Sequence, residues 1–388
     1  MLSHGAALLC ALLAPFGAVN AAPQIGLPIP KGYSGEAQKL ANPTYGPIPG
    51  ESNVYNYYWG TDRPFPGNIT DPIFPSETGP PGADDALWQD LLAAGWLMFE
   101  FYQQGVERFT EREFVKADMP KHTYRRIQEI RNNAAGHIRI FQNQISPTSI
   151  KPGPCKYAFP FKDPVSFLAL LTILEISSMT SLTGLVQQPV LGASKSALLA
   201  IAEVEARHEA WALMDLWDED PFGGPSETLF PYANEILEST ATFIVPGSCP
   251  KENPEFPQRH ALHGKKKLPP LAAAKDTESL IPGSVVTFEF PDPKNQPSFL
   301  TSKRIKTQYY AVFFHGALTV NIPIDTSAWP KKRIRVMVPE AFETKGVVVV
   351  VISDRPDAET RDSLVTGPAI LLQQPRGLEQ VLWHPGKE

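Results

Sequence analysis

The chain has 388 residues, a formal net charge of −6 at pH 7, 40 prolines and three cysteines. This length is enough for two domains and a sizeable core. The acidic balance gives no electrostatic reason to expect a nucleic acid as a partner. The prolines gather outside the stretches of helical pattern, so we expect long loops and an extended arm beside the compact domains.

The chain begins with the pattern of a secretory signal peptide, which we place at residues 1–21. Residues 6–19 form an apolar stretch interrupted by Pro15, and small residues follow it up to Ala21, where we expect cleavage. No lysine or arginine precedes the stretch, so a buried N-terminal helix is the alternative. No later run has about 20 uninterrupted apolar residues, and we therefore expect no membrane span. The predicted location is secreted, either extracellular or in the cell wall.

Two cysteines remain after removal of such a signal, Cys155 and Cys249. An even pair in an oxidising compartment predicts one disulfide, and two unpaired thiols are the alternative. The triplet Asn68-Ile69-Thr70 is an Asn-x-Thr sequon without an interfering proline, and it lies in a polar loop. In an exported protein this pattern predicts a glycan on Asn68.

Helical pattern fills residues 83–245, after an arm at residues 22–82 that is rich in Pro, Gly, Tyr and Asn and lacks a helical period. The predicted helices are about 84–109, 122–145, one opening at 163, 194–217 and 226–245. Asp84 and Asp85 are expected to cap the first helix. Asp163 followed by Pro164 is a typical helix start. The third helix is apolar nearly all round, which suits the centre of a bundle.

Strand-like runs follow a proline-rich, basic linker at residues 246–278. The predicted strands are 285–290, 308–324, 333–338, 347–352 and 369–372, with turn residues between them. They indicate a small β-sandwich-like domain at residues 279–375, with a tail at 376–388. The fold class is thus α+β multidomain, a helical bundle followed by a small all-β domain. By fold analogy alone, we expect the β-domain to contact a cell-wall polymer or an extracellular protein.

One constellation points to metal chemistry. Glu205 and His208 are spaced i, i+3 and so lie on one helical face. Di-metal bundle proteins carry such a Glu-x-x-His pair on two helices and a single Glu on each of the other two. The carboxylates bridge two cations, and the imidazole is a neutral ligand. Glu175 adds a carboxylate inside an apolar helix, which is costly unless the group is paired, hydrogen-bonded or metal-bound.

The same segments carry a family resemblance. Asp163-Pro164-Val165-Ser166-Phe167 leading to Glu175, and then Val204-Glu205-Ala206-Arg207-His208-Glu209-Ala210-Trp211, resemble the exported fungal ferritin-like proteins linked to stress response and sexual development. Phe101-Tyr102-Gln103-Gln104-Gly105 and Val245-Pro246-Gly247-Ser248-Cys249-Pro250 are also similar to that family. The resemblance covers about residues 40–290. It implies a ferritin-like four-helix bundle and an ancestral di-iron site, and little about a substrate.

The chain departs from the family at the ligand positions of two helices. The family's first helix carries Leu-Glu-x-Leu-Glu before the Phe-Tyr pair, and its two carboxylates fall here at Gly95 and Met98. Glu100 is no substitute, because two residues past Met98 corresponds to about 200° around a helix. Glu107 also faces away. In the second helix His137 is in place, but Ala134 stands where its partner carboxylate belongs.

The retained set is Glu175, Glu205, His208 and His137, for which three interpretations remain open. The first is a metal-free hydrogen-bonded network. The second is a site for one ion of iron or manganese, since two carboxylates and one or two imidazoles still suit one divalent metal. The third is a di-iron oxidase with ligands at other positions. We predict an exported, non-enzymatic structural or stress- and development-associated protein with a degenerate di-metal site. The alternative is a metal-dependent oxidase or oxygenase, mononuclear or di-iron.

Overall fold

A computed structural model describes residues 59–64, 71–225, 243–254, 268–274, 277, 280–291, 296–297, 307–325, 333–356, 358, 363–374 and 378. The predicted signal peptide, the sequon at Asn68 and most of the fifth predicted helix lie outside these residues. The chain divides into two units, residues 1–42 and residues 43–388, and every described residue belongs to the second.

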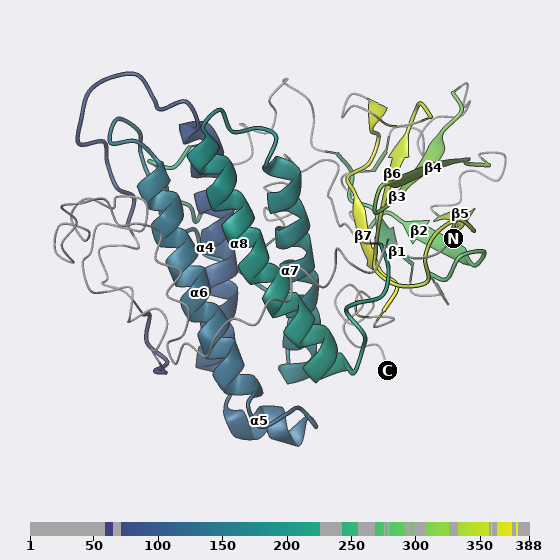
Figure 1. Cartoon of the computed structure of the whole chain (residues 1–388), viewed down its shortest axis with the longest axis horizontal. Helices are drawn as coiled ribbons and strands as arrows, with labels where there is room; N and C mark the ends of the chain where they lie inside the picture. Colours follow the sequence, from purple (N-terminus) through teal and green to yellow (C-terminus); the bar gives the residue numbers. More distant parts are fainter. Residues whose placement is uncertain are drawn as a thin grey trace, which may run out of the picture. The chain divides into compact units, whose positions relative to one another are not determined.

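Four long helices form a bundle (Figure 1). They are α4 (Asp85–Arg108), α6 (Thr123–Gln144), α7 (Pro164–Leu185) and α8 (Gly192–Trp211). Helix α4 packs along α6, and α7 packs along α8. A short helix α5 (Glu111–Lys116), which the sequence pattern did not reveal, separates α4 from α6. The π-helix η4 (Ala212–Leu216) continues α8, so the predicted fourth helix is confirmed almost to its end.

Helix α7 begins as its sequence predicts and forms the core of the bundle. The Asp163 carboxylate accepts a hydrogen bond from the Ser166 amide at 2.8 Å, and Pro164 occupies the first turn. Phe167, Leu168 and many of the later apolar side chains are buried. Among the described helices, α7 alone is long and apolar enough to cross a membrane, but 72% of its most apolar window is buried inside the protein. Burial of this kind is expected of a central bundle helix.

Asp84 occupies the N-cap position of α4 and Asp85 lies in its first turn, as predicted, but neither side chain forms the expected capping bond to that turn. Asp84 has φ −109° and ψ 8° instead of the extended conformation of a capping residue. Its carboxylate accepts from the amides of Val190 at 2.7 Å and Leu191 at 3.1 Å. The Asp85 carboxylate accepts from the Ser146 amide at 2.9 Å. Both aspartates therefore tie connecting loops to the start of α4.

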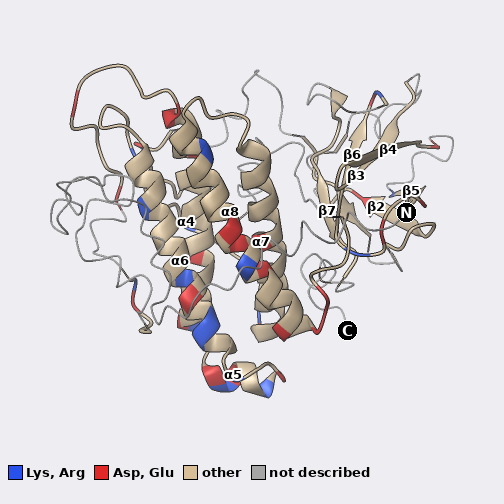
Figure 2. Cartoon of the chain, viewed as in Figure 1, with Lys and Arg blue, Asp and Glu red and all other residues tan. Residues whose placement is uncertain are grey.

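Charged side chains are unevenly distributed over the bundle. Helix α7 has only one charged residue, Glu175. Lysine, arginine and acidic residues are frequent on α5 and on the adjoining end of α6 (Figure 2). There Arg126 pairs with Glu129 one turn later. The charged side chains at this end lie on the solvated surface. Glu175, by contrast, lies inside the core and needs a partner there.

Two antiparallel sheets follow the bundle in sequence. One has the strand order β1-β2-β5, with β1 (Ala272–Ala273), β2 (Val285–Glu289) and β5 (Arg333–Met337). The other has the order β4-β3-β6-β7, with β3 (Tyr310–His315), β4 (Leu318–Pro323), β6 (Val347–Ser353) and β7 (Ala369–Leu372). Side chains of both sheets share one core, which contains Phe288 from the first and Phe313 from the second. The predicted small all-β domain is thus confirmed.

The strand boundaries differ from the sequence pattern in two places. The single predicted strand at residues 308–324 is a hairpin of β3 and β4, with His315 pairing with Leu318 across the turn. Gly316 lies in this turn with φ 55°, a conformation that glycine adopts without strain. Strand β1 pairs with β2 from inside the stretch that the composition assigned to a linker.

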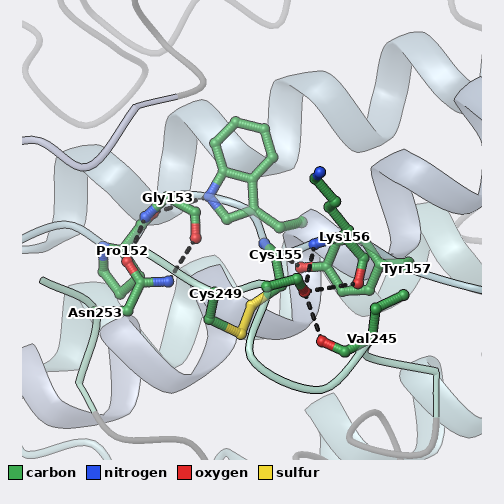
Figure 3. The surroundings of a disulfide bond; sticks show 10 residues. Pro152, Gly153, Cys155, Lys156, Tyr157, Val245, Cys249 and Asn253 are labelled. Carbon is green, nitrogen blue, oxygen red and sulfur yellow. Dashed lines mark hydrogen bonds between the residues drawn. A yellow bond between two sulfur atoms is a disulfide. The ribbon is translucent and has the colours of Figure 1, made fainter. Parts of the chain in front are cut away.

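A disulfide joins Cys155 to Cys249, as predicted (Figure 3). Two further contacts hold the same pair of segments together. The Asn253 side chain bonds to both the amide (2.9 Å) and the carbonyl (2.7 Å) of Gly153, and the Val245 amide bonds to the Lys156 carbonyl at 2.9 Å. The loop before α7 and the segment at residues 243–254 are therefore fixed to one another.

Candidate functional site

The bundle encloses a cavity of about 30 Å³ that all four long helices line. Its walls include the four residues proposed from the sequence as metal ligands, His137, Glu175, Glu205 and His208. They also include Gly95, Met98 and Ala134, the positions where the resembling family carries carboxylates. The remaining side chains are mostly apolar. By volume the cavity has room for a water molecule or a single ion.

Glu175 is held by side chains from two other helices. Its Oε2 lies 3.1 Å from Nδ1 of His208 on α8, and its Oε1 accepts a hydrogen bond from the Tyr102 hydroxyl on α4. The carboxylate is only 1% exposed. Both of its oxygens therefore have a donor within the protein, which offsets the cost of burial.

Asn133 on α6 extends this chain of hydrogen bonds. Its Nδ2 lies 3.1 Å from Nε2 of His208. With the amide nitrogen donating, Nε2 accepts, and the ring proton of a neutral His208 is on Nδ1, where it is donated to Glu175. One polar network, made of Tyr102, Glu175, His208 and Asn133, thus joins all four helices without an ion.

Glu205 and His137 form a looser second pair. His137 Nδ1 lies 4.0 Å from Glu205 Oε1, beyond hydrogen-bond distance, and Glu205 Oε2 is buried without a hydrogen-bond partner. Burial, with the nearby Glu175 charge, raises the pKa of Glu205 well above its ordinary value, although Ser178 lowers it in part. Burial also lowers the pKa of His137 to about 3, helped by His208 and Arg207. Both shifts disfavour the charged forms, the carboxylate of Glu205 and the imidazolium of His137.

The space next to Gly95 is already filled. A Cβ atom on Gly95 would lie 2.8 Å from Cε2 of Phe141 and 3.0 Å from its Cδ2. A carboxylate side chain at this position would therefore require the Phe141 ring to move. Met98 and Ala134 also line the cavity with apolar side chains. This side of the cavity is therefore apolar and closely packed.

Glu100 and Glu107 face away from the cavity, as the helical spacing predicts. Glu100 forms a two-pronged ion pair with Arg63, with one N–O distance of 2.9 Å. Glu107 accepts a hydrogen bond from Gln103 at 2.7 Å. Neither carboxylate substitutes for the groups missing at positions 95 and 98.

Two members of the network were not among the residues proposed from the sequence. Tyr102 belongs to the Phe-Tyr motif of α4, but its bond to Glu175 on another helix is not evident from the sequence. Asn133 lies four residues before His137, a position that shares its helix face. Glu209, next to His208, is half-buried, and burial together with Glu175 raises its pKa to about 7.

The donor set decides which metal centres fit. Two ions do not fit the described part of the cavity, because its walls offer only two carboxylates, Glu175 and Glu205, and Phe141 fills the space beside Gly95. One divalent ion suits the chemistry of two carboxylates and two imidazoles, and Glu205 Oε2 is an unpartnered oxygen that an ion would satisfy. Within the described residues, however, no three Asp, Glu, His or Cys side chains are arranged to hold one ion.

Comparison with known proteins agrees with the fold. Residues 85–214 match the family model for the ferritin-like domain. The protein is thus built from a helical ferritin-like domain followed by a small antiparallel β-sheet region. It is similar to Protein rds1 of Schizosaccharomyces pombe, at 25% identity over 174 residues, which is 43% of this chain. The match spans 41% of the length of that relative.

Proposed function

We propose that this chain is an exported, non-enzymatic protein whose ferritin-like bundle is a structural module with a degenerate di-metal site. The observation that carries the proposal is the closed network on Glu175. The carboxylate that would bind metal in an intact centre has Tyr102 on one oxygen and His208 on the other. The association with stress response or development rests on the sequence resemblance alone.

A hydrogen-bonded network is more stable than the same buried side chains would be without partners. A buried carboxylate without partners is strongly destabilising, whereas a fully hydrogen-bonded one is tolerated and makes the packing of the helices specific. Glu205 is tolerated differently, because burial and the Glu175 charge raise its pKa and so disfavour its charged form. The bundle is therefore expected to be stable without an ion in the cavity.

Export is a separate part of the proposal. It is supported by the signal-peptide pattern at residues 1–21, by the sequon at Asn68 and by the disulfide between Cys155 and Cys249. Disulfides persist in oxidising compartments. N-terminal sequencing of protein recovered from culture medium should begin at Ala22. Retention of the intact N-terminus inside the cell would contradict export.

A metal-dependent oxidase or oxygenase with one iron or manganese ion is the second candidate. The unpartnered Oε2 of Glu205 favours it. Glu175, Glu205, His208 and His137 would hold the ion, which would supply redox chemistry when bound. The Tyr102 hydroxyl would then orient Glu175.

Elemental analysis of the full-length secreted protein, purified without chelators, separates the two candidates. The structural proposal predicts well below one iron or manganese per chain, in the wild type and in Glu205→Gln alike. Glu203→Gln is the matched control, because Glu203 is on the same helix but exposed. Stoichiometric metal in the wild type and in Glu203→Gln, lost in Glu205→Gln, would overturn the proposal.

A further inference from the structure

A thioether and an imidazole line the cavity at the same level of the bundle. Met98 on α4 and His137 on α6 both belong to the cavity wall. Two contacts show that α4 and α6 run antiparallel: Gly95 lies against Phe141, and Gln103 accepts a hydrogen bond from Arg131 at 3.1 Å. Positions 98 and 137 fall between these contacts on their helices, so the two side chains reach the cavity at a similar height.

His137 and Glu205 are the polar groups of the cavity that stay outside the network on Glu175. His208 has both ring nitrogens within hydrogen-bond distance of network members. His137 Nδ1, by contrast, is 4.0 Å from Glu205 Oε1, and Glu205 Oε2 is buried without a hydrogen-bond partner. Buried polar atoms normally have partners, so the unpartnered oxygen points to a missing cation or donor in the cavity.

Met98, His137 and Glu205 together make a mixed set of sulfur, nitrogen and oxygen donors. A methionine can simply fill a gap in a core, but its thioether is also a soft metal ligand. Thioethers select copper(I), and imidazole suits copper as well, whereas manganese and other hard ions prefer carboxylates and carbonyls. The set therefore fits a soft ion better than the hard ions of a carboxylate-rich centre.

Charge and coordination number favour the same ion. A single positive charge offsets the one carboxylate of this set, whereas a divalent ion would leave a net charge buried in a mostly apolar cavity. Within the described residues no three Asp, Glu, His or Cys side chains are arranged around one ion. Copper(I) tolerates few ligands, and the cavity of about 30 Å³ has room for one such ion.

We propose that the bundle cavity is a site for one copper(I) ion, held by His137, Met98 and Glu205 from three different helices. This inference goes beyond the proposed function, because the network on Glu175 stays intact beside the ion and no reaction is assigned to it. It also gives a role to Met98, which lies where the resembling family carries a carboxylate. The exchange of a carboxylate for a thioether changes the preferred metal from a hard ion to a soft one.

Anaerobic titration of the full-length protein with copper(I), against a colorimetric copper(I) chelator, tests the site. The wild type should bind one copper(I) per chain. Met98→Leu nearly keeps the side-chain volume but removes the sulfur, and it should bind at least about tenfold more weakly. Met179→Leu is the matched control, since Met179 is a partly buried methionine of α7 outside the cavity lining. No copper(I) binding by the wild type, or equal binding by Met98→Leu and the wild type, overturns the proposal.

X-ray absorption of the copper-loaded protein provides a second readout, which a purely structural role of Met98 would not move. A sulfur neighbour of copper should be present in the wild type and in Met179→Leu, and absent in Met98→Leu. Sulfur that is absent from the wild type spectrum would overturn the assignment of Met98. Iron and manganese contents, not copper, decide the proposed function, so the two proposals can fail independently.

Discussion

The hydroxyl of Tyr102 on α4 donates a hydrogen bond to Oε1 of Glu175 on α7, and His208 lies on the other oxygen of the same carboxylate. This relationship crosses the centre of the bundle and occupies the group that an intact di-metal centre would use as a ligand. Single substitutions can remove the contacts of this network one at a time.

Tyr102→Phe should destabilise the protein by about 1–3 kcal/mol, because it leaves a buried carboxylate oxygen without its donor. Urea unfolding of the full-length protein measures this free energy. Tyr124→Phe is the control, since that half-buried hydroxyl bonds to the Val106 carbonyl at 3.1 Å. It should cost only about 0.5–1.5 kcal/mol. Equal stability of Tyr102→Phe and wild type would show that the bond contributes nothing.

The two buried glutamates should respond differently to neutral, isosteric substitution. Glu205→Gln should change the free energy of unfolding by less than about 1 kcal/mol at pH 7, because burial and the Glu175 charge raise the pKa of Glu205 and so disfavour the charge that the substitution removes. Glu175→Gln should cost about 1–3 kcal/mol, because an amide cannot accept on both sides. Thermal and urea unfolding of both variants check the difference. The reverse order of stabilities would mean that the charges are assigned to the wrong residues.

Asp85 should make stability depend on pH in the acid range. Burial alone would raise its pKa, but hydrogen bonds from Ser146, Ser149 and Gly82 outweigh burial and lower the pKa. A carboxylate whose pKa is lower in the folded state than in the unfolded state stabilises the folded protein. This contribution is complete at pH values above the unfolded-state pKa, which is near 4. That contribution is lost as the pH falls through the folded-state pKa.

Urea unfolding of Asp85→Asn from pH 3 to pH 7 tests this dependence. The variant should be less stable than wild type by about 1–3 kcal/mol at pH 7, and the difference should shrink below about pH 4. Glu203→Gln, at an exposed position, should show no such trend. A difference that is constant from pH 3 to pH 7 would exclude a titrating role for Asp85.

Two helical glycines should differ in their tolerance of alanine. A Cβ on Gly95 would press against the Phe141 ring at 2.8 Å, whereas a Cβ on Gly136 meets nothing within 4 Å. Gly136→Ala should stabilise the protein by about 0.5–1 kcal/mol through helix propensity. Gly95→Ala should be less stable than Gly136→Ala by about 1–3 kcal/mol, because overpacking offsets that gain. Equal effects on the melting temperature would show that the cavity wall is not tightly packed.

The sequence predicted those features that depend on residues close together in the chain. Asp163 and Pro164 mark the start of α7 by local chemistry, and helical spacing placed Gly95 and Met98 on the cavity wall and Glu100 away from it. The hydrogen-bond partners of the Asp84 side chain could not be predicted, for the opposite reason. Its partners Val190 and Leu191 lie more than a hundred residues away, and no local pattern reveals them.

The candidate site shows the same division between local and distant information. The spacing of Glu205 and His208 brought both to the cavity, as expected. The hydrogen-bond partners of these side chains depend instead on which helices lie next to one another. Tyr102 reaches Glu175 across 73 residues of sequence, and Asn133 reaches His208 across 75. A single sequence carries no record of these pairings.

Thermal unfolding of the full-length protein with and without metal tests the central claim most directly. The account predicts the same melting temperature in chelator, in added manganese(II) and in added iron(II) under anaerobic conditions. An ion that binds the folded state, added at a concentration of about a hundred times its dissociation constant, would stabilise that state by about 2.7 kcal/mol. A metal-dependent rise in melting temperature that disappears in Glu205→Gln and persists in Glu203→Gln would contradict the account.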